Sequence, residues 1–177
     1  MNGIFIIEDE QHAEPMGEFR KFVDAAVELV RLSTLPWDEP PNRAPCTSWK
    51  TCGRHYDIVE YDFTGCPWQE VSRVHALTVS HDGPKWAQAF LRGAVPHEAH
   101  GIPDPSPPIE VIHVPLVGEG VETWRPVPAQ RTGGGLFRIL DVGVPDDEDW
   151  RFLPGTAVRC SVRNLSGGEA LVVDAEA

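Results

Sequence analysis

The sequence contains no run of 18 apolar residues, and its first residues lack the basic region and long apolar segment of a secretory signal. We therefore expect neither a membrane span nor export, and predict a cytoplasmic protein. Basic residues are also scarce, since 15 of them against 27 acidic residues give a formal net charge of -12. Phosphate backbones and anionic membranes would have to approach against this field, so neither nucleic acid nor membrane is an expected partner. A basic protein would be attracted instead.

Sequence motifs of the common enzyme classes are missing as well. No Gly-x-Ser-x-Gly elbow presents a nucleophile, and neither a lysine nor a helix that could hold phosphate follows the glycines at 133–135. The acidic run at 146–149 lacks the alternating acids and central glycine of a calcium loop. We therefore predict no catalytic residue and no cofactor.

The chain does contain enough apolar residues, 41% of 177, for one sizeable core or two small ones. Residues 93–108 hold five prolines and almost no large apolar side chain, so we predict a linker there. The linker would separate an N-terminal domain at 1–92 from a C-terminal domain at 109–177. The predicted fold class is α+β.

The apolar pattern of the first domain predicts the element order β-α-β-β-α. Residues 3–7 are β-branched and aromatic, which indicates a buried strand, and residues 18–32 place apolar side chains at helical spacing. Strands at 56–63 and 70–80 would form a hairpin. A short helix is expected at 84–91, because proline is tolerated in a first helical turn.

The second domain alternates short apolar runs with turn residues, which is typical of an all-β fold. Five strands are predicted, at 109–116, 123–129, 135–142, 156–164 and 169–174. We expect a small barrel of the SH3-like kind, since an open sheet of this size would leave its edges unpaired.

The segment 36–68 is the most unusual, because it holds three of the four cysteines and three of the six tryptophans. Without an export signal, free thiols or a metal site are favoured over disulfides. Thiolates and an imidazole can bind zinc, and the candidate ligands are Cys46, Cys52, His55 and Cys66. Their spacing lacks the Cys-x2-Cys pair common in zinc sites, so we favour the alternative that the cysteines pack as small apolar groups beside Trp49.

Tryptophans in proline-rich or acidic loops often anchor protein interfaces. Trp37 and Trp49 bracket charged and polar residues, so aromatic and polar contacts could be offered together. The predicted partner-binding residues are Trp37, Asp38, Glu39, Asn42, Arg43, Trp49 and Arg54.

The stretch PWDEPPNRAPCTSWKTCGR at 36–54, followed by the strand at 56–62, resembles a group of uncharacterised bacterial proteins. The pattern Val-Pro-Leu at 114–116 with Thr-Trp-Arg-Pro-Val at 123–127, and later Trp-Arg-Phe at 150–152 with Pro-Gly-Thr at 154–156, resembles a small bacterial β domain without assigned activity. The resemblance implies a bacterial origin and supplies no catalytic residue. Some small acidic bacterial α+β proteins are immunity proteins that neutralise toxins, an analogy at the level of fold and charge.

Three functional hypotheses follow from these patterns. The leading one is a non-catalytic bacterial module that binds a basic protein, as immunity or antitoxin proteins do. The second is a zinc-stabilised or metal-dependent enzyme that uses Cys46, Cys52, His55 and Cys66. The third is a small-ligand-binding protein whose pocket lies between the two domains.

Overall fold

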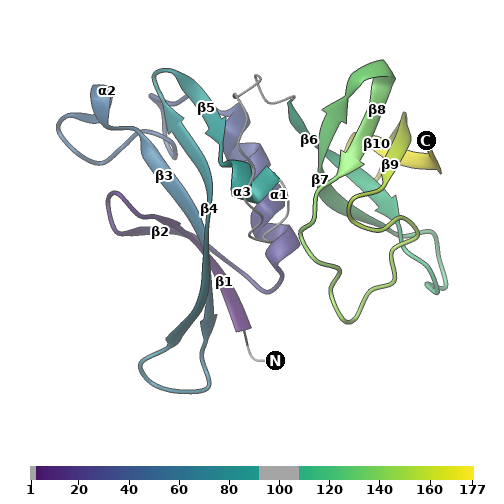
Figure 1. The fold of residues 1–177 in the computed structure, drawn as a ribbon, viewed down its shortest axis with the longest axis horizontal. Coiled ribbons are helices and arrows are strands. Elements are labelled where there is room, and N and C mark those ends of the chain that lie inside the picture. The colour runs from purple at the N-terminus through teal and green to yellow at the C-terminus, as the bar shows by residue number, and fades with distance from the viewer. Residues whose placement is uncertain (1–2, 92–107) are drawn as a thin grey trace. The chain divides into compact units, whose positions relative to one another are not determined.

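The computed structural model describes residues 3–91 and 108–177, and the chain divides into two compact units, Met1–Val95 and Pro96–Ala177 (Figure 1). The mixed α+β class is confirmed, with strands predominating over helices. The predicted linker at 93–108 lies outside the described residues except for Pro108. Within the described ranges, no helix is long and apolar enough to cross a membrane.

The N-terminal unit is built on one antiparallel sheet with the strand order β2-β1-β3-β4-β5. Its strands are β1 (Gly3–Asp9), β2 (Glu14–Phe19), β3 (Arg54–Asp62), β4 (Gln69–Ser80) and β5 (Gly83–Trp86). Its helices are α1 (Phe22–Thr34), α2 (Trp49–Cys52) and α3 (Gln88–Leu91). The observed order β-β-α-α-β-β-β-α therefore contains three elements, β2, α2 and β5, that the predicted order β-α-β-β-α lacks.

Two edge strands account for most of this difference. In β2, Pro15 and Gly17 interrupt the alternation of apolar and polar residues, yet the segment pairs with β1, as in Ile7↔Gly17. Helix α1 consequently begins at Phe22, later than predicted. Strand β5 contains Pro84 and pairs with β4, which confines the predicted helix at 84–91 to α3.

Helix α1 contacts strands β1 to β4 and supplies much of the core of this unit. Its apolar face includes the fully buried Leu29, and Ile7, Tyr56 and Leu77 are fully buried on the strands. Burying one large aliphatic side chain contributes roughly 1.5–3 kcal/mol, so this face holds the helix on the sheet. The helix ends at Thr34, and the C-cap residue Leu35 has the extended backbone favoured before a proline.

The C-terminal unit is a closed five-stranded barrel, as the sequence pattern predicted (Figure 1). Its strands are β6 (Ile109–Pro115), β7 (Trp124–Thr132), β8 (Leu136–Ile139), β9 (Ala157–Leu165) and β10 (Gly168–Glu176). Neighbouring strands are antiparallel, and parallel pairing of β10 with β6 closes the barrel. The core is aliphatic and aromatic, with Ile112, Val114, Val127, Phe137 and Val158 buried.

Strand β7 carries two prolines where a barrel strand would normally have neighbours on both sides. Pro126 and Pro128 pair with β6, whereas β8 pairs only with β7 residues from Ala129 onward. The Pro128 carbonyl still accepts from the Leu140 N–H at 3.0 Å, but proline has no backbone N–H to donate in return, so regular pairing with β8 does not extend along this stretch. The prolines thus account for the short length of β8.

Candidate functional site

The segment 36–49, called the tryptophan loop below, connects α1 to the first residue of α2. The buried side chain of Asn42, only 1% exposed, holds this loop in place. The Asn42 Nδ2 donates to the carbonyl oxygens of Leu32 and Leu35 at 2.8 and 3.1 Å, and its Oδ1 accepts from the Tyr56 hydroxyl at 2.9 Å. One side chain therefore joins the loop to the end of α1 and to β3.

Aromatic and cationic side chains gather on the outer side of the tryptophan loop. The ring centroids of Trp37 and Trp49, both half-buried, lie 5.7 Å apart, and the Arg43 guanidinium lies 5.3 Å from the centre of the Trp49 ring. Asp38 and Glu39 are exposed beside them. Arg43 and Trp49 also border a hollow of about 350 Å³.

Five of the seven predicted partner-binding residues, namely Trp37, Asp38, Glu39, Arg43 and Trp49, keep exposed or half-exposed side chains in or next to this loop. Asn42 and Arg54 are buried, with Arg54 only 5% exposed, and both bind other groups of the chain. Polar side chains such as these are usually exposed, and a surface position was therefore predicted. Because both are buried and hydrogen-bonded within the chain, neither belongs to the partner-binding surface.

A buried carboxylate lies next to the loop. The side chain of Asp9 is fully buried at the end of β1 and makes three hydrogen bonds. Its Oδ2 lies 2.9 Å from Arg54 Nη1 and 2.6 Å from His12 Nδ1, and its Oδ1 accepts from the His55 backbone N–H at 3.1 Å. Arg54 Nη1 also binds Glu14 at 2.7 Å. A buried charge is tolerated when it is paired in this way.

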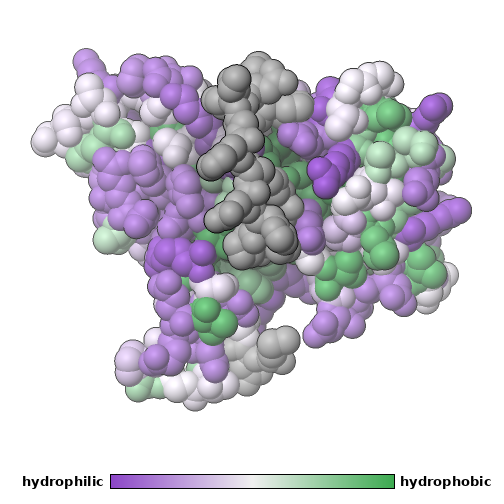
Figure 2. Space-filling view, in the orientation of Figure 1, coloured by the Kyte–Doolittle hydropathy of each residue, from purple (hydrophilic) through white to green (hydrophobic). Residues whose placement is uncertain are grey.

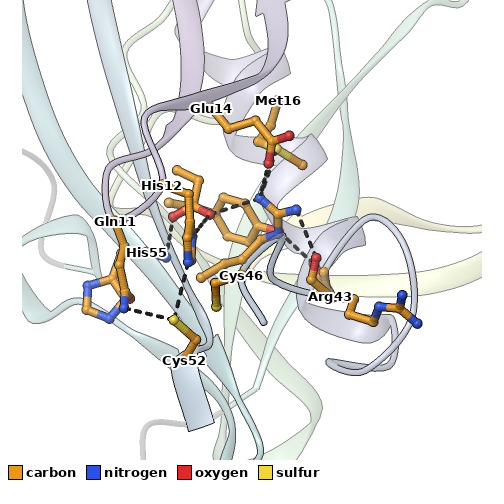
Figure 3. Close-up of polar contacts among 12 residues, drawn as sticks. Gln11, His12, Glu14, Met16, Arg43, Cys46, Cys52 and His55 are labelled. Atoms are coloured by element: carbon orange, nitrogen blue, oxygen red, sulfur yellow. Dashed lines mark hydrogen bonds and ion pairs between the residues drawn. The ribbon is translucent and has the colours of Figure 1, made fainter. Parts of the chain in front are cut away.

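The His12 imidazole connects this carboxylate to two thiols. His12 Nε2 lies 3.3 Å from Cys52 Sγ, and one nitrogen of His12 together with both sulfurs, of Cys46 and Cys52, lie within 4.8 Å of one another (Figure 3). Gln11 Nε2 donates to Cys52 Sγ at 3.4 Å, and Ser48 Oγ donates to Cys46 Sγ at 3.5 Å. We call His12, Cys46 and Cys52 the thiol–imidazole cluster.

The cluster shifts the proton affinities of its members. Hydrogen bonds from Cys52 and Ser48 lower the pKa of Cys46 to about 7, which makes it a readily ionised thiol. The contact with Cys46 raises the pKa of Cys52. Burial lowers the pKa of His12, but hydrogen bonds to Asp9 and Cys46 outweigh this and leave the pKa above its ordinary value.

The cluster overlaps only in part with the predicted zinc ligands. Cys46 and Cys52 come together, but the imidazole is that of His12, and the His55 ring lies beside His75 at 5.9 Å. Cys66 is exposed in the β3–β4 connection, at the opposite end of β3 from Arg54. Cys46 and Cys52 are half-buried with polar neighbours, so the apolar packing role that we had favoured does not describe them.

Strand pairing explains why the sequence pattern did not place His12 beside the cysteines. β1 and β3 are antiparallel with Asp9 opposite Tyr56, and the Glu10 N–H donates to the His55 carbonyl at 2.9 Å. The turn after β1 therefore lies beside the residues that precede β3. The only local signal was Asp9 three residues before His12, a spacing that lets a carboxylate reach an imidazole nitrogen.

The C-terminal unit has a groove of its own. It has a volume of about 710 Å³ and is lined in part by His113, Trp124 and Glu169. Burial lowers the pKa of His113, although a hydrogen bond to the Leu171 backbone opposes the shift. In this groove the buried His113 Nδ1 has no hydrogen-bond partner among the described residues.

Comparison with known protein families, curated proteins and solved structures found no match to this chain. Functional assignment therefore depends on the chemistry of these side chains.

Proposed function

We propose that the protein is a non-catalytic module that binds a basic protein partner through Trp37, Asp38, Glu39, Arg43 and Trp49. The observation that carries this proposal is the packing of Trp49 against both Trp37 and Arg43 in a loop that the buried Asn42 holds in place. Tryptophan and arginine are the residue types that most often dominate binding energy at protein interfaces.

The way the loop is held supports this role. A surface that is ordered before binding loses less conformational entropy when a partner docks. Three hydrogen bonds of Asn42 link the loop to α1 and β3. The tryptophan rings are therefore presented on a supported backbone, and more of their contact energy remains available for affinity.

Charge supports a basic partner. The net charge is -12, and Figure 2 shows hydrophilic residues over most of the visible face of the N-terminal unit, on the left. Asp38 and Glu39 place carboxylates next to Trp37. Such a field accelerates encounter with a cationic protein, and salt weakens this effect.

Neutralisation of a basic toxin in the bacterial cytoplasm, as by immunity or antitoxin proteins, is the most concrete form of this proposal. The acidic charge and the aromatic surface support it. For the C-terminal unit we propose an SH3-like barrel, which the sequential order of its five strands and its closure by the first and last of them support.

The test is capture of a partner from a bacterial lysate, followed by titration of the purified partner with matched variants. We expect Trp37→Ala and Trp49→Ala each to weaken binding at least about tenfold. Trp68→Ala is the control, because Trp68 is an exposed tryptophan in the β3–β4 connection. The association rate should fall as salt rises from about 0.05 to about 0.5 M. Binding that is independent of salt and unaffected by both loop substitutions would reject the proposal.

A further inference from the structure

We propose that His12, Cys46 and Cys52 bind a zinc ion, with the Asp9 carboxylate orienting the imidazole from behind. This site goes beyond the partner surface proposed above and uses none of its residues. Zinc is favoured over magnesium or calcium because two thiolates and one imidazole are soft or borderline ligands, whereas the latter ions prefer oxygen.

The distances suit a tetrahedral zinc ion. With Zn–S bonds of about 2.3 Å and Zn–N bonds of about 2.0–2.1 Å, tetrahedral angles place a nitrogen and a sulfur ligand about 3.6 Å apart and two sulfur ligands about 3.8 Å apart. His12 Nε2 and Cys52 Sγ are 3.3 Å apart, and the three ligand atoms lie within 4.8 Å of one another. The observed separations therefore include the range that a tetrahedral ion requires.

The carboxylate behind the imidazole is the feature that points most directly to a metal. Asp9 Oδ2 lies 2.6 Å from His12 Nδ1, which places the proton on Nδ1 and leaves the Nε2 lone pair directed at the sulfurs. Histidines that bind metals regularly donate their other N–H to a carboxylate in this way. Arg54 and the His55 N–H hold Asp9 in place, so the orientation of the ring is fixed before an ion arrives.

The sulfurs also have the surroundings of thiolate ligands. Gln11 Nε2 donates to Cys52 Sγ at 3.4 Å, and Ser48 Oγ donates to Cys46 Sγ at 3.5 Å. Outer hydrogen bonds of this kind stabilise the charge on a metal-bound sulfur. Two thiolates would balance the charge of the dication, and both cysteines are half-buried, so an ion can reach them.

The three ligands come from three separate segments. His12 lies in the β1–β2 turn, Cys46 in the tryptophan loop, and Cys52 at the end of α2. Among the described residues, no fourth His, Cys, Asp or Glu belongs to this group. We therefore infer three protein ligands, a fourth position filled by water or an external donor, and a link between the loop and the sheet.

The test uses the whole 177-residue chain, stripped of metal with a chelator and titrated with Co²⁺ as a spectroscopic probe. We expect one Co²⁺ per chain, tetrahedral d–d bands, a charge-transfer band of two-thiolate intensity, and displacement by Zn²⁺. Cys46→Ser, Cys52→Ser and His12→Ala should each abolish this spectrum. His55→Ala and Cys66→Ser are the matched controls and should leave it unchanged.

Asp9→Asn keeps the shape of the side chain but removes its charge, and we expect it to weaken Zn²⁺ affinity by about 10–100-fold. If a ligand substitution prevents folding, the spectrum of the wild-type protein and the two control variants decide the question. Absence of a thiolate charge-transfer band in wild-type protein, or its loss in Cys66→Ser, would overturn the proposal. Trp37→Ala should bind Co²⁺ normally, so failure of the metal site and failure of the partner surface give different results.

Discussion

Asn42→Ala is the substitution that most directly tests how the tryptophan loop is held in place. It removes three hydrogen bonds at once, two that Asn42 donates to the end of α1 and one that it accepts from Tyr56. Tyr56 is fully buried, so its hydroxyl would remain inside the protein without this partner. The Leu32 carbonyl keeps a second bond, from the Leu35 N–H at 3.1 Å.

The expected cost follows from these contacts. An intramolecular hydrogen bond contributes about 1 kcal/mol net, and a buried polar group left without a partner costs about 1–3 kcal/mol. We expect Asn42→Ala to lower the free energy of unfolding by about 3 kcal/mol. Tyr56→Phe removes only one of the three bonds and should cost about 1.5 kcal/mol.

The measurement is urea unfolding followed through the amide signals of β3, which report on the N-terminal unit. The double variant should be less destabilised than the sum of the single variants, by about 1 kcal/mol, because both remove the same bond. Thr47→Ala is the matched control, since Thr47 is an exposed polar residue of the same loop, and it should change stability by less than about 0.5 kcal/mol. A cost for Asn42→Ala below about 1 kcal/mol, or fully additive effects, would refute the view that this side chain fixes the loop.

Three further predictions concern other parts of the molecule. Leu29→Ala should lower the unfolding free energy of the N-terminal unit by about 2–5 kcal/mol in urea titrations, because Leu29 is fully buried; a cost below about 1 kcal/mol would contradict its place in the core. Burial lowers the pKa of His113 below its ordinary value of 6.5, so the unfolded chain binds the proton more tightly and stability should decline as pH falls through 6.5. His113→Gln should make that decline shallower in unfolding curves measured between about pH 7 and pH 5, and equal slopes would count against it. In metal-free protein, mass spectrometry should find Cys46 alkylated by iodoacetamide well before Cys160 at about pH 8, since the pKa of Cys46 is lowered to about 7 and burial raises that of Cys160 to about 11; equal rates would contradict this.

The barrel could be predicted from the sequence because its information is local. Each strand contains a short run of apolar, often β-branched residues, and turn residues separate the runs, so all five strands appear within a few residues of their predicted bounds. The N-terminal sheet is harder to predict, since Pro15 and Gly17 interrupt the alternation of apolar and polar residues that would indicate strand β2. Pairing with β1, a contact outside the segment itself, makes it a strand.

The same distinction holds for the site. The composition of the segment 36–54 pointed to the tryptophan surface, because tryptophan and arginine near prolines are visible in the sequence. Arg54 was misplaced at the surface because its partner, Asp9, is 45 residues away in the sequence, and only the pairing of β1 with β3 brings the two together. His12 was missed for a similar reason, since only the register of β1 against β3 brings it to Cys52.

The two sheets also differ in how they treat their outermost strands. The barrel closes on itself, and the flanking strands β2 and β5 of the other sheet each contain a proline, Pro15 or Pro84. A proline in an edge strand removes one of the N–H groups on which a foreign strand could form a ladder. Together with the mutual repulsion of chains that carry a charge of -12, this should let the protein accumulate to high concentration in a cell without seeding fibrils.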